Sequence, residues 1–262
     1  MKSQSIITLL TDFGTKDTYV PQMKGVLLSM NPQLKIVDVS HQVSPHNILE
    51  GGFLLKTVYS YFPKKTIHVC VVDPGVGTSR KAILIETENY FFIGPDNGIF
   101  TFALENEKIK SIIELKNSEY HLKNVSITFH GRDIFTPVAA HLSLGMKPQQ
   151  FGPALEKIKS LDAPSVHQNE KSVEGEVLYA DHFGNLVSNI QKKDLKPHAH
   201  YSMKIQDKTI EDISKTYFDR PKNNLVALFG SSGYLEIAIV EGSAKQLFPS
   251  FNKIVLQEIK KS

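Results

Sequence analysis

Residues 66–77 read TIHVCVVDPGVG, and this stretch decides the fold. The run from Thr66 to Val72 is apolar and rich in β-branched residues, so it predicts a strand buried on both faces. Pro74 and Gly75 then force a turn directly after Asp73. A carboxylate is therefore expected at the end of a buried strand, which is where α/β sheets bind ligands.

Strand and helix patterns alternate on both sides of this run. Further strands are expected at residues 5–11, 35–39, 81–87 and 90–93, and helices at 19–30, 47–61 and 135–144. The alternation is typical of α/β proteins. It predicts an α/β N-terminal domain with a mixed, mainly parallel sheet.

The pattern changes near residue 160. Residues 160–172 are polar, contain Pro164 and have no hydrophobic period, so we expect a linker there. Short strand-like runs separated by turns follow at 173–180, 186–190, 200–205, 225–229, 235–240 and 254–259. They predict a small all-β C-terminal barrel of antiparallel strands. The expected domains are 1–165 and 172–262.

The bulk composition points to a soluble, cytoplasmic protein. The net charge of +3 over 262 residues is too small to suggest a nucleic-acid partner. Cys70 is the single cysteine, so it forms no internal disulfide, and its apolar run predicts a buried thiol rather than a nucleophile. No apolar run approaches the ~18–20 residues of a membrane span. The first apolar run is also too short for a signal peptide.

Four turn motifs each follow an apolar, β-rich run. They are TDFG at 11–14, VDPGVG at 72–77, FHGRD at 129–133 and ADHFGN at 180–185. Strand ends of α/β sheets converge on ligand sites, so four such turns predict a site for a polar ligand.

Asp73 has a plausible partner in Arg80, which follows seven residues later across a Gly-rich turn. The loop can fold back and pair the guanidinium with the carboxylate, which would present fixed donors to a water molecule. A helix cap or a plain surface salt bridge are the simpler interpretations of Asp73. His130 lies before a predicted helix, where an isolated histidine is more often structural. Asp133 is expected to cap that helix.

Asp12 and Asp17 flank the turn before the first predicted helix. A phosphate loop is excluded there, because the turn contains neither Gly-Lys-Ser/Thr nor Gly-x-Gly-x-x-Gly. Carboxylates at this place suit hydroxyl or ammonium groups, as when an aspartate binds ribose hydroxyls. The histidines form no metal-binding motif with a neighbouring carboxylate, so no catalytic metal is expected.

The order and wording of the motifs resemble a known family. TDFG, VDPGVG, GPDNG at 94–98, FHGRD, DHFGN and YLEIA at 234–238 are similar to those of the S-adenosyl-L-methionine hydrolases, also called SAM hydroxide adenosyltransferases. These enzymes are relatives of the fluorinases and chlorinases. The resemblance runs from about residue 6 to about residue 245 and includes several motifs in the same order.

The resemblance implies an enzyme that cleaves S-adenosyl-L-methionine to adenosine and L-methionine without a cofactor. It also implies a homotrimer with active sites between subunits. The family's catalytic set corresponds to Asp73, Arg80 and His130. Its substrate-binding positions correspond to Asp12, Phe13, Asp17, Phe129, Asp181, Phe183, Asn185, Ser231, Tyr234, Glu236 and Val240. Ser232 stands where the fluorinating relatives have arginine, which leaves open how the methionine carboxylate would be held.

The residues fit this chemistry. The sulfonium is a good leaving group, so the reaction lacks only a strong nucleophile at ribose C5′. Asp73 can accept a proton from water, Arg80 can orient that carboxylate, and His130 can hold the water. Two alternatives remain: a halogenase with chloride or fluoride as nucleophile, which Asp73 would repel, and a nucleoside-binding module without turnover.

Overall fold

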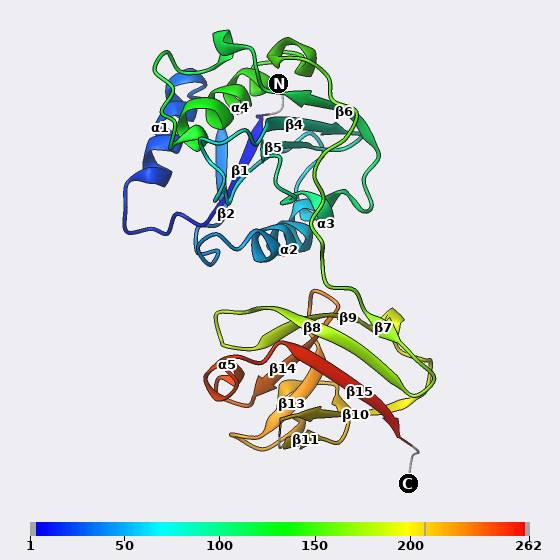
Figure 1. Cartoon of the computed structure of the whole chain (residues 1–262). Coiled ribbons are helices and arrows are strands. Elements are labelled where there is room, and N and C mark those ends of the chain that lie inside the picture. Colours follow the sequence, from blue (N-terminus) through cyan, green and yellow to red (C-terminus); the bar gives the residue numbers. More distant parts are fainter. Residues whose placement is uncertain (1–3, 207, 260–262) are drawn as a thin grey trace. The chain divides into compact units, whose positions relative to one another are not determined.

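The computed structural model describes residues 4–206 and 208–259. The chain divides into two compact units, Met1–Leu161 (unit 1) and Asp162–Ser262 (unit 2). Figure 1 shows the elements of both. Within the described residues, no helix has the length and apolar character needed to span a membrane.

Unit 1 contains a six-stranded mixed sheet in the order β2-β1-β3-β5-β4-β6. The strands are β1 (Ile6–Thr11), β2 (Lys35–Ser40), β3 (Ile67–Val71), β4 (Ala82–Thr87), β5 (Phe91–Pro95) and β6 (Ile109–Glu114). The pairs β1–β2, β1–β3 and β3–β5 are parallel, whereas β4–β5 and β4–β6 are antiparallel. The sequence did not predict β6, whose first two residues, Ile109 and Lys110, are exposed.

Helices cover both faces of this sheet (Figure 1). They are α1 (Tyr19–Met30), α2 (Ile48–Val58), α3 (Thr101–Leu104), a five-residue π-helix η3 (Gly131–Phe135) and α4 (Thr136–Ser143). The predicted helix at 47–61 is confirmed as α2 followed by a 3₁₀ turn, Tyr59–Tyr61. One core cluster joins the sheet to α1 and α4, and a second joins it to α2 and α3.

Strand β3 lies inside the sheet between β1 and β5, and all five of its residues are buried. The predicted buried strand is therefore confirmed. Cys70 is fully buried in it, and burial raises the pKa of the thiol, so the expectation of an unreactive core thiol is also confirmed. A strand with layers on both faces has a fixed end, which gives Asp73 a rigid support.

Unit 2 is built on a nine-stranded, nearly closed barrel-like sheet. Its strands are β7 (His167–Gln168), β8 (Ser172–Ala180), β9 (Leu186–Gln191), β10 (His200–Ile205), β11 (Lys208–Ile210), β12 (Ile213–Ser214), β13 (Leu225–Phe229), β14 (Tyr234–Ile239) and β15 (Lys253–Ile259). A short helix, α5 (Ala244–Leu247), follows β14. Seven of its strand pairs are antiparallel, and β12–β13 is parallel.

Two local expectations differ from the structure. The short strand β7 lies inside the predicted linker, where it pairs with β8. The turn with His130 follows a segment of turns and irregular chain, not a strand. The β-rich run expected before this turn therefore forms no strand, unlike the runs before Asp12, Asp73 and Asp181.

Candidate active site

A buried ion pair stands at the end of β3. Arg80 Nε donates to both oxygens of Asp73, at 3.0 and 2.9 Å, and Arg80 Nη2 donates to Asp73 Oδ2 at 2.5 Å. The two side chains are 6% and 5% exposed. The predicted pairing of these residues is confirmed, and the interpretation as a plain surface salt bridge is wrong.

His130 completes this cluster from a distant part of the chain. Arg80 Nη2 lies 2.7 Å from His130 Nδ1. Because a guanidinium has only donors, Nδ1 is the acceptor and the ring proton is on Nε2. Burial, and then the charge of Arg80, lower the pKa of His130. The imidazole is therefore a neutral group with one N–H to offer.

The turn at residues 73–80 brings Arg80 back to Asp73. Thr78 Oγ1 donates to Gly75 O at 2.7 Å and accepts from Arg80 N at 3.3 Å. Gly77 has φ +78°, and a Cβ there would lie 2.7 Å from Ile127 O. Glycine is thus required at this position both for the backbone conformation and for the close approach of the neighbouring loop.

Asn97 supports the same strand end from the GPDNG turn. Its Nδ2 donates to Val72 O at 2.8 Å, and its Oδ1 accepts from Ile99 N. The carbonyl directly before Asp73 is thereby satisfied and held in place. The sequence marked this turn as one of the motifs of the resemblance but gave Asn97 no part in the site.

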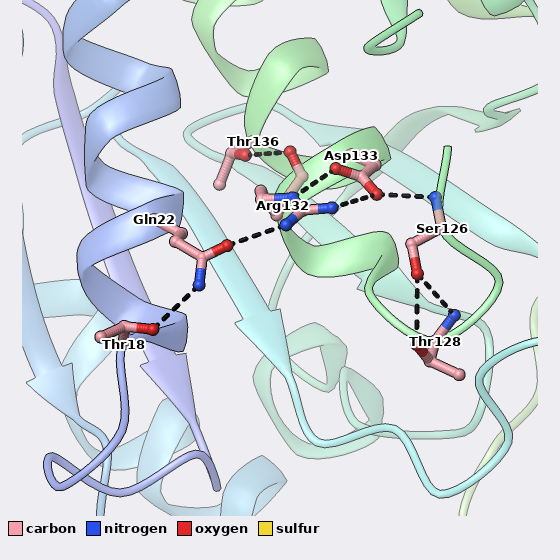
Figure 2. Close-up of polar contacts among 7 residues, drawn as sticks. All are labelled: Thr18, Gln22, Ser126, Thr128, Arg132, Asp133 and Thr136. Atoms are coloured by element: carbon pink, nitrogen blue, oxygen red, sulfur yellow. Dashed lines mark hydrogen bonds and ion pairs between the residues drawn. The ribbon is translucent and has the colours of Figure 1, made fainter. Parts of the chain in front are cut away.

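The π-helix η3 is held to α1 and to the preceding loop by the contacts in Figure 2. Arg132 Nη1 donates to Gln22 Oε1 at 2.8 Å. Asp133 is fully buried and accepts from Ser126 N at 2.8 Å and from Arg132 Nε at 2.6 Å. The expectation that Asp133 caps the following helix is wrong. It lies inside the helical segment and anchors the loop before His130.

Asp12 follows β1 directly, as predicted, and its Oδ2 accepts from His46 N at 2.9 Å. Behind it, buried Thr11 contacts buried His41 through Oγ1 and Nδ1, which lie 2.9 Å apart. His41 O also accepts from Gly14 N at 2.7 Å. His41 thus contacts the residue before Asp12 through its ring and Gly14, two residues after Asp12, through its carbonyl group, and both contacts hold the turn in place. Asp17 is exposed in the same turn.

Three aromatic side chains form a cluster next to these turns. Phe13 lies 5.8 Å from Phe129, and Tyr19 lies 5.3 Å from Phe129, both with rings edge to face. The Arg132 guanidinium lies 4.9 Å above the Phe129 ring. Phe129 is buried, whereas Tyr19 is 47% exposed. Sequence reasoning selected Phe13 and Phe129 and missed Tyr19, which was interpreted only as a helix start.

In unit 2, Asp181 and Asn185 close a tight hairpin between β8 and β9. Asn185 N donates to Asp181 Oδ1 at 2.8 Å, and Asn185 Nδ2 donates to Asp181 Oδ2 at 2.9 Å. Gly184 has φ +82°, and a Cβ there would lie 2.1 Å from Ser243 Oγ. Phe183 at the hairpin tip is 75% exposed, so it does not belong to the core of its unit.

Glu236 on β14 is the one buried carboxylate among the described residues of unit 2. Its Oε2 accepts from Tyr217 OH at 2.6 Å. Burial raises its pKa, and the charge of nearby Asp181 adds to this effect. A Cβ on Gly230 would lie 1.7 Å from Glu236 Oε1, so that glycine makes room for the carboxylate. Tyr217 was missed, since nothing in its local sequence marks it.

The structure therefore forms two groups from the predicted residues. Unit 1 joins Asp73, Arg80 and His130, and places Phe13 against Phe129. Unit 2 joins Asp181 with Asn185 and brings Glu236 near them. Tyr234 is buried at the start of β14, Val240 is buried directly after its end, and Ser231 is exposed in the turn before it. In the described residues, no three His, Cys, Asp or Glu side chains are grouped as metal ligands.

Two family models match the chain. Residues 7–152 match the SAM hydroxide adenosyltransferase N-terminal domain, and residues 175–250 match the C-terminal domain. The chain belongs to the SAM hydroxide adenosyltransferase family. The two family domains fall in unit 1 and unit 2, respectively.

Relatives within and beyond this SAM hydroxide adenosyltransferase family are similar over most of their length. An (R)-S-adenosyl-L-methionine hydrolase from Methanocaldococcus jannaschii is 38% identical, over 92% of this chain and 91% of that protein. The crystal structure of an uncharacterized conserved protein from Thermotoga maritima is 36% identical, with a TM-score of 0.87 over 96% of this chain and 99% of that one. A fluorinase from Actinoplanes is more distant, at 28% identity over 73% of each chain.

Proposed function

We propose that this chain hydrolyses S-adenosyl-L-methionine to adenosine and L-methionine. Water attacks ribose C5′ in line, the C5′–S bond breaks, and the water oxygen becomes the 5′ oxygen of adenosine. The single observation that supports this most is the buried Asp73–Arg80–His130 cluster. Four relatives at 32–38% identity are named (R)-S-adenosyl-L-methionine hydrolases, which supports the same substrate.

We infer a part for each proposed catalytic residue, and the hydrogen bonds support these parts. Free water has a pKa of ~15.7, so it needs a proton acceptor as it attacks. Asp73 is that acceptor, since Oδ1 accepts one hydrogen bond from Arg80 and has a second lone pair. Within residues 4–206 and 208–259, Arg80 Nη1 has no hydrogen-bond partner. It is the donor that stabilises the developing hydroxide.

His130 positions the water rather than taking its proton. Its Nδ1 lone pair is occupied by Arg80, so it offers only the Nε2–H group. Donation from Nε2 to the water oxygen leaves a lone pair of that oxygen for C5′. A protonated ring would put an N–H against Arg80 Nη2, which is a second reason for the neutral form. Holding the reactants in this geometry lowers the barrier by several kcal/mol.

The substrate is held by two sets of residues. In unit 1, Asp12 and Asp17 take the ribose hydroxyls, and Phe13 and Phe129 provide apolar contact. The unit 2 set binds the adenine and methionine groups, and it consists of Asp181, Phe183, Asn185, Ser231, Tyr234, Glu236 and Val240. We propose functional boundaries at 1–165 and 172–262, with a linker at about 160–172 and an antiparallel barrel in the second part.

We propose a cytoplasmic homotrimer with active sites at subunit interfaces and no cofactor. The two binding sets belong to different units, and Phe183 exposes 75% of its surface at a hairpin tip. Aromatic side chains are common anchors where a second chain covers them, and we propose this part for Phe183.

A halogenase is the second candidate, because fluorinases are among the relatives. A halide would have to approach the buried carboxylate of Asp73, which is 5% exposed and carries a negative charge. Like charges repel strongly where water is excluded. Water is therefore the better nucleophile at this site. A nucleoside-binding module would need no such ion pair.

One experiment separates these functions. The protein is incubated in water labelled with heavy oxygen, with each sulfonium epimer of S-adenosyl-L-methionine, and with or without chloride or fluoride. Adenosine that carries the label, with unlabelled methionine, is the expected result. A halogenated nucleoside would mean a halogenase, and intact substrate of both epimers would mean a binding module.

A further inference from the structure

The barrel-like sheet of unit 2 is not closed by hydrogen bonds at one seam. β11 and β12 are the two ends of the strand order, and β10 lies next to β11. A cavity of about 860 Å³ lies at this seam, between β10, β12 and the segment 192–199. This seam cavity has the size of many small-molecule sites. It contains none of the residues proposed above for catalysis or for substrate binding.

Positive charge is concentrated around the seam cavity. Its basic lining residues are Lys192, Lys193, Lys196, Lys215, His198 and His200, against one acid, Asp212. The whole chain has a net charge of only +3, so this lining is far more basic than the average surface. A concave site lined by one sign of charge concentrates ions of the opposite sign.

Ion pairs leave three of these lysines available. Lys196 pairs with Glu258 at 2.7 Å, and Asp212 is taken up by Arg220. In the part of the chain that the structure describes, Lys192, Lys193 and Lys215 make no ion pair with an acid. Asp219, four residues after Lys215, feels the charge of this lysine, but its carboxylate accepts from the backbone N–H groups of Lys215 and Thr216. It is therefore already partly satisfied.

The remaining lining is apolar and aromatic. Tyr201 is buried, and Phe229 and Ile213 are half-buried beside it. A ligand with one carboxylate group would fill little of this cavity and would neutralise only one of the three lysines. We propose that the seam cavity binds a small anion that carries several phosphate groups. Lysine ammonium groups bind phosphate as point charges, and three such lysines without an ion-pair partner line this cavity.

The test is calorimetric titration with inorganic tripolyphosphate and, separately, with uridine triphosphate, at about 50 mM salt. Saturating adenosine is present throughout, so that the proposed nucleoside site is occupied. Binding of one tripolyphosphate per chain is expected. The triple variant Lys192→Ala, Lys193→Ala, Lys215→Ala should bind at least about tenfold more weakly. Both proteins should release adenosine at the same rate, which also shows that the variant is folded.

A matched variant controls for general charge effects. Lys171→Ala, Lys204→Ala, Lys245→Ala removes three exposed lysines of the same unit outside the seam cavity and should bind tripolyphosphate as the parent does. Tighter binding of the uridine nucleotide would support ring contact with Tyr201 and Phe229, and equal binding would support recognition of the phosphates alone. Absence of binding, equal losses in both triple variants, or much tighter binding of single-stranded RNA would overturn the proposal.

Discussion

Arg80 connects the other two residues of the proposed catalytic cluster, since its Nη2 atom contacts both Asp73 and His130. Its guanidinium also lies 5.4 Å from the Phe135 ring. One side chain thus orients the acceptor of the water proton and determines the tautomer of the histidine. The residues of this cluster cannot be exchanged independently, and two substitutions test their separate parts.

Asp73→Asn should lower the rate of adenosine release by ~10²–10⁴-fold, because an amide cannot accept the water proton. Adenosine binding, measured by calorimetry, should remain close to that of the parent protein. The exposed Asp162→Asn is the matched control and should leave the rate unchanged. Parent-like turnover of Asp73→Asn would show that Asp73 is not the base.

Arg80→Lys should lower the rate by about 10²-fold or more, although the charge is retained. A lysine ammonium is a point charge, so it cannot contact both Asp73 and His130 in the fixed plane of the guanidinium. Steady-state kinetics should show the loss mainly in kcat. A near-parent kcat would mean that Arg80 acts only as a diffuse positive charge.

At the scale of elements, the turn after β3 determines where Arg80 lies. Gly77→Ala would strain a backbone with φ +78° and would push a Cβ to 2.7 Å from Ile127 O. We expect a lower kcat with a nearly unchanged KM, because the loop that carries Arg80 shifts. Gly145→Ala is the control: φ is +98° there and nothing lies within 4 Å of the added Cβ. It should cost about 1 kcal/mol of stability and leave kcat unchanged.

The centre of the unit 1 sheet contains a buried titratable group. His68 on β3 is fully buried, contacts Thr8 Oγ1 through Nδ1 at 2.8 Å, and has its pKa lowered to about 3 by burial. In the unfolded chain its pKa is about 6.5. At pH values between these two pKa values, the unfolded state binds a proton at His68 that the folded state does not. The free energy of unfolding therefore decreases as the pH falls through this range.

The free energy of unfolding by urea should therefore decrease from pH ~6.5 downward, with part of the decrease due to His68. His68→Asn keeps a hydrogen-bonding group near the position of Nδ1 but does not titrate, so the unfolding of this variant should depend less on pH. The exposed His167→Asn should keep the pH dependence of the parent protein. Identical pH dependence in all three proteins would contradict this role of His68.

At the scale of the whole molecule, the proposed site requires residues from both units. If the site lies between subunits, Asp73→Asn and Asn185→Ala chains that are unfolded and reassembled together should recover activity. With equal mixing, about one site in four combines an intact unit 1 with an intact unit 2 from different chains. Each variant reassembled alone is the control. No recovery, with mixed trimers confirmed by mass, would place each site within one chain.

The sequence by itself determined the features that depend on neighbouring residues. The β-branched run before Asp73 predicts the buried strand, because apolar side chains stand on both of its faces. The seven-residue spacing to Arg80 predicts the ion pair, because a Gly-rich turn can return the chain over that distance. The ordered motifs likewise resemble the family that the domain matches identify.

Only the tertiary structure decided the features that depend on residues far apart in the chain. His130 lies 50 positions from Arg80, so its tautomer and neutral form follow from a contact that no local pattern encodes. Asp133 has the sequence position of a helix cap, but its carboxylate accepts from Ser126 N. Residues 109–114 form strand β6 through pairing with β4, which lies more than twenty positions earlier in the chain. The seam cavity exists because β10 and β12 meet without a hydrogen-bonded ladder. Local propensity specifies strands and turns, but the three-dimensional packing of distant segments decides which polar atoms become partners.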